Sequence, residues 1–268
     1  MIKDITLGQF FPGNSLLHRL DPRIKIILTI LFIAIVFLAK STLSYLLVLA
    51  FTIALIIISG ISFKTVLKSL KPIVFVLIIT SALNIFWTVG DDLIFSFWII
   101  DIYAEGVNFA ILMVLRITSL LIGTSVLLTY TTSPIMLTDG LERLLAPLKA
   151  IKVPVHEFSL MMTIALRFIP TLIEETDKIM SAQKARGADF TTGSIISRAK
   201  ALIPVLIPLF ISSFRRADEL ATAMECRCYH GGDGRTKMNT PHLKVIDILT
   251  VSVFIVICVI IVMLNRFA

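Results

Sequence analysis

The stretch FSLMMTIALRFIPTLIEETDKIMSAQKARG (residues 158–187) begins as an apolar run and continues, without a turn signal, into a charged segment. Arg167 and Pro170 interrupt the apolar half, which disfavours a plain membrane span. One face nevertheless continues at helical spacing past the end of the apolar run. Its positions are Ala165, Phe168, Leu172, Thr176, Ile179 and Gln183. The pattern predicts a single amphipathic helix that lies along the membrane interface or packs beneath a membrane domain.

Both ends of this helix carry local signals. Pro154 suits the first turn, because its missing N–H would have no partner there. Gly187 suits the end, because glycine adopts left-handed backbone without a Cβ penalty. The predicted helix has about 33 residues and a length of roughly 50 Å. It ends in the cationic sequence Lys184-Ala185-Arg186-Gly187.

A second stretch, PLFISSFRRADELATAMECRCYHGG (residues 208–232), has the same organisation. The apolar run at 201–214 contains Pro204 and Pro208 and leads directly into a charged helix. Ser194 is a favourable N-cap for this helix, which is expected to end before the final glycine pair. Hydropathy alone would place both apolar runs in the membrane, and two extra spans would leave the topology unchanged. We expect instead that neither run spans.

The two stretches align at an offset of 41 residues over their C-terminal halves. The aligned pairs are Asp177 with Asp218, Ala182 with Ala223, and Arg186 with Arg227. At the same offset, Glu174 and Glu175 fall on Arg215 and Arg216. Two related helices that cross near these positions would therefore bring opposite charges together. The alternative is two unrelated, solvated helix faces.

The rest of the chain has the composition of a membrane protein. Of its 268 residues, 57% are hydrophobic and only 16% are charged, and the mean hydropathy is +0.94. Soluble domains are about a quarter charged. A membrane-spanning helix needs about 17–20 apolar residues. Five apolar stretches come close to or reach this length: 24–39, 43–59, 72–89, 107–130 and 245–264.

The charges of the loops predict the orientation, since Lys and Arg collect on the cytoplasmic side. The N-terminal tail carries Lys3, Arg19, Arg23 and Lys25. The loop between the second and third stretches carries Lys64, Lys68 and Lys71 and no acid, whereas the loop at 90–106 carries Asp91, Asp92, Asp101 and Glu105 and no cation. The N-terminus is therefore expected inside and the C-terminus outside.

The predicted fold is an all-α integral membrane protein with about five transmembrane helices. Residues 1–130 would form the N-terminal tail and the first four spans. Residues 131–244, which hold more than half of the 25 Lys and Arg, would form a cytoplasmic coupling domain with two long crossing amphipathic helices. Residues 245–268 would form the last span in the cell membrane.

Several classes of function are disfavoured. The net charge of +7 fits cytoplasmic loops, so no nucleic-acid partner is expected. Three cysteines make no even disulfide framework, and the N-terminus lacks a signal-peptide pattern. Cys226, Cys228 and His230 form a weak C-x-C-x-H pattern without a fourth ligand, so neither a metal nor a cofactor is expected. Phosphate-binding and nucleophile motifs are missing, which indicates a protein that is not an enzyme.

Two kinds of arginine remain to be explained. Arg116 lies deep in the fourth apolar stretch, where pairing with a neighbouring helix is the simpler interpretation and a coupling role the alternative. The predicted spans carry almost no carboxylates, which disfavours a transporter driven by its own ion gradient. Arg186 and Arg227, each between small residues, can pair bidentately with carboxylates of a partner. The alternative is that each only complements the dipole of its helix.

Three segments resemble one known family, the T component of energy-coupling factor (ECF) transporters, the EcfT/CbiQ family. PGNSLLHRLDPRIK (12–25) is similar to its opening signature. The segments LLAPLKAIKVPVHEFSLMMTIALRFIPTLIEETDKIMSAQKARGADF (144–190) and PLFISSFRRADELATAMECRCYHGGDGRT (208–236) resemble its coupling region. The likeness covers nearly the whole chain and is strongest to the type shared by several substrate-binding subunits.

The resemblance implies a non-catalytic scaffold in a complex with two ABC ATPases of the EcfA type and a small S component that binds a vitamin or similar micronutrient. It also implies two x-Arg-x motifs that dock the ATPases: Ala185, Arg186 and Gly187, and Cys226, Arg227 and Cys228. Because a cysteine has a Cβ, Cys228 is not expected to end its helix as Gly187 does. ATP-driven closure of the ATPases would move the two arginine ends and tilt the S component.

Two other classes of protein compete with this interpretation. A permease subunit of another ABC-type importer would carry an E-A-A-x-x-x-G cytoplasmic loop, which the sequence lacks. A membrane scaffold without a role in transport is the other alternative. The transported substrate is not encoded in this chain, because the S component would select it.

Overall fold

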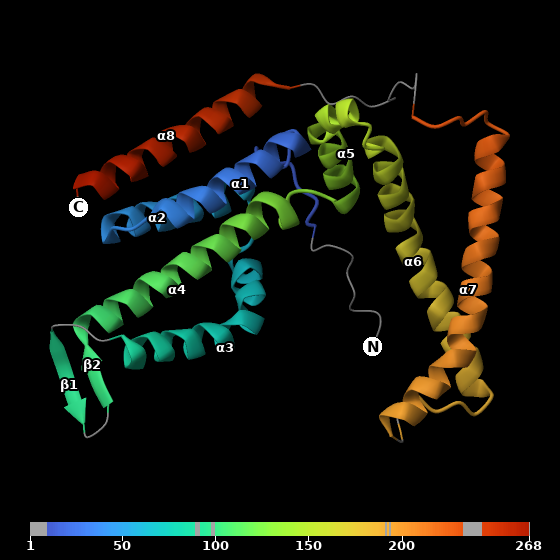
Figure 1. Ribbon diagram of the computed structural model, residues 1–268, viewed down its shortest axis with the longest axis horizontal. Coiled ribbons are helices and arrows are strands. Elements are labelled where there is room, and N and C mark those ends of the chain that lie inside the picture. Colours follow the sequence, from blue (N-terminus) through green and yellow to red (C-terminus); the bar gives the residue numbers. More distant parts are fainter. Residues whose placement is uncertain are drawn as a thin grey trace. The chain divides into compact units, whose positions relative to one another are not determined.

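The computed structural model describes residues 10–88, 92–97, 100–190, 192, 194–232 and 243–267. Its contacts divide the chain into two compact units. Of the described residues, those of 141–232 form the helix-pair unit, and those of 10–140 and 243–267 form the membrane unit. Helices dominate both units (Figure 1).

The membrane unit is built from long apolar helices with few polar side chains. They are α1 (Pro22–Leu38), α2 (Thr42–Ser59), α3 (Phe63–Trp87), α4 (Ala104–Thr124) and α8 (Val245–Phe267). α4 continues as a π-helix (Ser125–Tyr130), and α5 (Pro134–Leu144) follows it along the chain. The carboxylate of Asp21 caps α1 by accepting the N–H of Arg23 at 2.9 Å. Gly60, with φ +70°, ends α2 in the left-handed conformation.

Close helix contacts hold the membrane unit together. Phe32 of α1 is fully buried against Gly123 of α4, where an added Cβ would lie 2.1 Å from the ring. Phe51 of α2 meets Phe254 of α8 edge to face, with ring centroids 4.9 Å apart. Large apolar side chains on the outer faces stay exposed, among them Ile57 and Phe75, as expected of helices that face lipid.

Within the part of the chain that the structure describes, five helices are long and apolar enough to cross a membrane, which confirms the predicted fold class. They lie at Thr42–Ser59, Phe63–Trp87, Ala104–Tyr130, Ile196–Glu225 and Val245–Arg266. The set differs from the predicted one in two members. α1 has 17 residues and is shorter than these five, whereas Ile196–Glu225 qualifies by length and composition. That 201–214 does not cross the membrane stays a prediction.

Two segments differ from the sequence prediction. An antiparallel hairpin, β1 (Leu93–Phe97) and β2 (Ile100–Tyr103), lies where only a loop was expected; its β-branched and aromatic residues favour strands. α3 starts at Phe63, nine residues before the apolar stretch, so Lys64, Lys68 and Lys71 lie on its first turns. Lysine is a good helix former, which explains the extension. Asp91 of the predicted outer loop lies outside the described residues.

Arg116 pairs with a neighbouring helix, as the simpler interpretation predicted. Its guanidinium donates to the hydroxyl of Tyr45 on α2 and lies over the Tyr45 ring, 5.3 Å from the centroid. Tyr45 is buried, so this contact between α4 and α2 replaces water around a charge at membrane depth.

A network of buried polar residues links the start of α1, the start of α8 and the end of the π-helix in the membrane unit. The Asp247 carboxylate on α8 is 1% exposed and accepts the N–H of Asp21 at 3.0 Å and the N–H of Lys244 at 2.7 Å. Lys25, 2% exposed, donates to the carbonyl of Thr131 at 2.8 Å. The Lys25 ammonium and the Asp247 carboxylate attract each other. The N-terminal segment, α8 and the end of the π-helix therefore share one network.

The helix-pair unit contains a 3-10 helix (Ala146–Ile151), α6 (Val155–Ala185) and α7 (Ile195–Glu225). α6 and α7 have 31 residues each. As predicted, Ser194 caps α7, its hydroxyl accepting the N–H of Ser197 at 3.3 Å. Pro170 lies inside α6, and Pro204 and Pro208 lie inside α7, where each removes one backbone N–H donor from its helix.

Candidate functional site

α6 and α7 form an antiparallel crossing pair (Figure 1). The amide of Gln183, near the end of α6, donates to the carbonyl of Pro204 on α7 at 3.5 Å. Nearer the middle, Glu175 of α6 accepts a hydrogen bond from Ser212 and pairs with Arg216 of α7 at 2.8 Å. The end of each helix therefore lies beside the beginning of the other.

The Glu175–Arg216 ion pair confirms the cross-helix contact predicted from the 41-residue offset. The two residues are themselves equivalent positions of the repeat, since 216 is 175 plus 41. Equivalent residues meet where a local two-fold axis passes, so α6 and α7 are related by an approximate two-fold rotation at this contact. The side chains are 22% and 37% exposed, so the pair contributes little stability and mainly fixes the crossing point.

The two helices end in the same backbone motif. In α6, the N–H of Ala188 bonds the carbonyl of Gln183 at 3.0 Å, and the N–H of Gly187 bonds that of Lys184 at 2.9 Å. These are the two hydrogen bonds of a Schellman motif, with Gly187 left-handed at φ +88°. Arg186 is the residue directly before the left-handed position.

α7 repeats these bonds at the same offset. The N–H of Tyr229 bonds the carbonyl of Met224 at 3.1 Å, and the N–H of Cys228 bonds that of Glu225 at 2.9 Å. Cys228 is left-handed at φ +57°. The expectation that Cys228 would not end its helix as Gly187 does was therefore wrong: the hydrogen bonds of the motif hold the cysteine in a conformation that its Cβ disfavours.

The predicted docking residues are all exposed at these two ends. This holds for Ala185, Arg186, Gly187, Cys226, Arg227 and Cys228. Neither Arg186 nor Arg227 forms a hydrogen bond or ion pair through its side chain with another described residue. Each guanidinium follows the last helical turn and can present its planar fork to a partner. The structure thus gives the two arginines equivalent backbone positions at opposite ends of one helix pair.

Because the helices are antiparallel, the two arginines are far apart. Arg227 lines a cleft together with Ile164 of α6, whereas Arg186 follows the last residue of that helix. The 22 residues from Ile164 to Arg186 correspond to roughly 33 Å of helical rise. The two ends cannot contact one small epitope at the same time.

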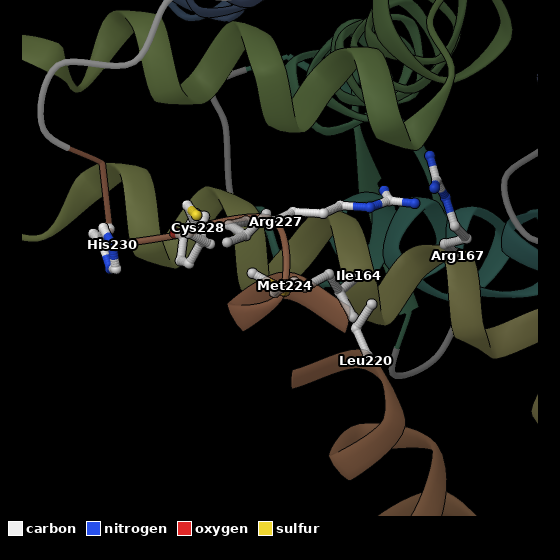
Figure 2. A pocket seen from close by; sticks show the side chains of 10 residues that line it. Ile164, Arg167, Leu220, Met224, Arg227, Cys228 and His230 are labelled. Carbon is white, nitrogen blue, oxygen red and sulfur yellow. The ribbon is translucent and has the colours of Figure 1, made fainter. Parts of the chain in front are cut away.

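The cleft beside Arg227 has a volume of about 600 Å³. It lies between the first half of α6 and the end of α7, and its wall is partly apolar, with Leu160, Ile164, Leu220 and Met224. Arg167, Arg227, Tyr229 and His230 supply the polar atoms. Figure 2 shows the Arg227 side chain extending along the cleft toward Arg167. Two cations of one cleft thus come from different helices.

Sequence reasoning treated Arg167 only as a break in an apolar run. The signal that could have indicated more is its position, because Arg167 is a lone cation in that apolar run. The weak C-x-C-x-H pattern has no structural counterpart, since among the described residues no three His, Cys, Asp or Glu side chains are grouped to hold a metal ion.

The Schellman ends predict opposite effects of two substitutions. Gly187→Ala is expected to destabilise the end of α6 by about 1 kcal/mol, because alanine disfavours left-handed backbone. A Cβ there would meet nothing within 4 Å, so no clash adds to this cost. Cys228→Gly should stabilise the end of α7 by a similar amount. Hydrogen exchange of 183–188 should become about fivefold faster in the first variant, and that of 224–229 slower in the second. Unchanged exchange in both would contradict the assignment.

Comparison with known proteins decides the family. The family model described as Cobalt transport protein, CbiQ, matches residues 13–238. The chain belongs to the CbiQ family. CbiQ-family relatives share sequence over nearly the full length, and each is named energy-coupling factor transporter transmembrane protein EcfT.

Three of these EcfT relatives illustrate the range of sequence identity. The protein of Ruminiclostridium cellulolyticum is 57% identical over 256 residues, 96% of this chain and 95% of the relative. The protein of Bacillus subtilis is 50% identical over 237 residues, 88% and 89% of the two chains. The protein of Lactococcus lactis is 44% identical over 265 residues, 99% of each chain. The resemblance seen in the sequence is confirmed: this CbiQ-family chain is a multi-pass transmembrane protein of the ECF transporter type.

Proposed function

We propose that the chain is the scaffold that couples two cytoplasmic ATPases to a substrate-binding S component during uptake of a vitamin or another micronutrient. The observation that carries the proposal is the pair of matched helix ends. Arg186 and Arg227 occupy the same position of two Schellman motifs and are exposed at opposite ends of one antiparallel helix pair. Two well-separated cationic ends with the same backbone motif suit two similar partners.

Arginine at these ends suits docking better than a role in helix stability. Complementing a helix dipole contributes only about 0.3–1 kcal/mol and would be served equally well by lysine. A guanidinium instead pairs bidentately with a carboxylate, and the small residues on either side let a partner approach closely. In this function, one ATPase binds Ala185-Arg186-Gly187 and the other binds Cys226-Arg227-Cys228.

The helix pair would transmit motion between the ATPases and the membrane. ATP-driven closure brings the two ATPases together and so moves the two arginine ends. The Glu175–Arg216 contact fixes the crossing point, so a displacement at the ends changes the angle between α6 and α7. Exposed apolar side chains of α7, among them Phe210 and Phe214, would carry this change to the S component, which tilts in the membrane.

The distribution of acidic residues in the membrane unit favours a transport process that is powered by another protein. The only acidic residues of helices α1–α4 and α8 are Glu105 and Asp247, and both lie in the first turn of their helix. A transporter driven by an ion gradient uses carboxylates near the middle of the membrane. In the proposed function the ATPases are separate chains that supply this energy.

Purification of the tagged chain from its native membrane tests the proposal. We expect two ATPase chains and one small membrane protein for each copy of the tagged chain, and the small protein should carry the bound vitamin. Recovery of the chain alone, or with a second full-size permease in place of the small membrane protein, would contradict the proposal. The identity of the small protein would also name the substrate.

The proposed orientation places residues 131–244 and the N-terminus in the cytoplasm. Single cysteines in a background without Cys226, Cys228 and Cys258 can test it. We expect an impermeant maleimide to label Lys40→Cys, between α1 and α2, in intact cells. Ser181→Cys, exposed on α6, should be labelled only after the membrane is opened. Labelling of Ser181→Cys from outside would show that the helix pair is not cytoplasmic.

A further inference from the structure

We infer that the cleft between α6 and α7 is a carboxylate site, in which Arg167 and Arg227 together hold an acidic side chain of the ATPase bound at the second docking end. The inference rests on the proposed function and adds a partner residue to one of its two ends. Both arginines line this cleft, and they come from different helices (Figure 2). The occupant is one Asp or Glu side chain of the docked ATPase.

The charge of the cleft favours such an occupant. Among the residues that the structure describes, its lining contains two guanidinium groups and no carboxylate. Arg167, like Arg227, forms no hydrogen bond or ion pair with another described residue through its side chain. Like charges that share a cleft repel each other, and an acidic side chain between them removes the repulsion and gains two attractions. The apolar wall around the cations lowers the local dielectric constant and strengthens both.

The cleft also has the size for a protein side chain. Its volume of about 600 Å³ leaves room for a carboxylate and the backbone that carries it. Leu160, Ile164, Leu220 and Met224 offer apolar surface to the methylene groups and neighbours of that side chain. Arg167 and Arg227 are themselves exposed, so the docked ATPase would have to cover the cleft for an acidic anchor there to become buried.

The first docking end has no cation at the helical position that corresponds to Arg167. Counted back from the two matched helix ends, Ala201, Val205 and Pro208 stand at the helical positions that Leu160, Ile164 and Arg167 have in α6. Val205 is buried, and Pro204 beside it accepts a hydrogen bond from Gln183. The two ends therefore share the docking arginine but differ in the groups around it. A partner with an acidic side chain at the right place is favoured at the Arg227 end alone.

A double-mutant cycle tests this inference. The affinity of the purified ATPase pair for the full chain, held in nanodiscs with its S component, is measured. Arg167→Gln should weaken binding at least about tenfold, because a carboxylate then loses one of two cations. Lys178→Gln, which removes another exposed cation of α6 outside the cleft, is the matched control and should leave the affinity within twofold.

The double-mutant cycle also shows at which docking end Arg167 acts. Arg167→Gln should be strongly non-additive with Arg227→Ala, since both act on one carboxylate, and additive with Arg186→Ala at the other end. Additivity with Arg227→Ala, or no effect of Arg167→Gln, would overturn the carboxylate site while leaving the proposed function intact. If Arg186→Ala and Arg227→Ala also left binding unchanged, the proposed function itself would fall.

Zero-length crosslinking identifies the occupant. A carbodiimide joins an amine to a carboxylate that it contacts, so R167K should form a crosslink to one Asp or Glu of an ATPase subunit. The wild-type chain has no amine at this position and is the control. A crosslink to Glu157 of this chain, to the S component or to a lipid headgroup, or no crosslink at all, would contradict the inference.

Discussion

Replacing both Arg186 and Arg227 with alanine is expected to abolish recovery of the ATPases with the chain, or to uncouple ATP hydrolysis from uptake. A charge pair at an interface costs about 2–5 kcal/mol when one side is removed, because the partner group stays unpaired. Each substitution therefore corresponds to about a 30-fold to several-thousand-fold loss of affinity. The two losses act on different ends, so the double variant should be far worse than either single one. Affinity capture combined with a vitamin-uptake assay measures both effects.

The fold should survive these substitutions. Both arginines are exposed at helix ends and, among the described residues, neither makes a side-chain hydrogen bond or ion pair. Arg215→Ala, which removes an exposed cation near the middle of α7, is the matched control and should leave recovery unchanged. Lysine at 186 or 227 should restore binding only in part, since a point charge does not reproduce the guanidinium fork. Normal recovery and uptake in the double alanine variant would show that these arginines only complement their helices.

The second large effect is expected in the membrane unit. Asp247→Ala removes a carboxylate that is 1% exposed and leaves the N–H groups of Asp21 and Lys244 without their acceptor. It also removes the negative charge that attracts the buried Lys25 ammonium. Each buried N–H left without an acceptor costs about 1–3 kcal/mol, and the lost attraction to Lys25 adds to this. We expect less of the variant to accumulate in the membrane. In detergent, we expect it to unfold at a lower temperature than the wild type.

Asp247→Asn is a milder change in the same network, because it removes the charge and keeps an oxygen. The amide oxygen can still accept one N–H, so the loss of stability should be smaller than in Asp247→Ala. Asp218→Asn on the exposed face of α7 removes an acid of the other unit and should not change the melting temperature. Melting curves of Asp247→Ala that match the wild type would show that the network of buried polar residues does not stabilise the membrane unit.

Periodicity and composition were sufficient for the parts of the fold that depend on one helix at a time. The apolar stretch at 43–59 corresponds to α2 almost residue for residue, because Ser41 and Gly60 set its ends locally. The offset of 41 residues also predicted an ion pair between Glu174 or Glu175 and Arg215 or Arg216, and the structure forms one of these pairs, Glu175 with Arg216. This was possible because equivalent residues of a two-fold repeat meet only at the axis, so a charge reversal between them marks the crossing point.

Features that depend on competing local preferences could not be predicted in this way. Cysteine has no intrinsic preference for left-handed backbone, so the matching end of α7 at Cys228 follows only from the hydrogen bonds that close the motif. Lysines at 64–71 suggested a loop, although lysine forms helices well and α3 includes them. Arg167 gained a possible role only when the fold placed it in one cleft with Arg227.

Site-directed crosslinking from the two helix ends tests the central claim most directly. A short photoreactive maleimide is attached either to Ala185→Cys in a background without native cysteines, or to Cys226 with Cys228 and Cys258 replaced. Each position is exposed and lies next to a docking arginine. The account predicts that each probe crosslinks to an ATPase, that the two probes reach different ATPase molecules of one complex, and that no crosslink forms to the S component. Crosslinks from both ends to a single ATPase molecule, or to membrane partners alone, would contradict it.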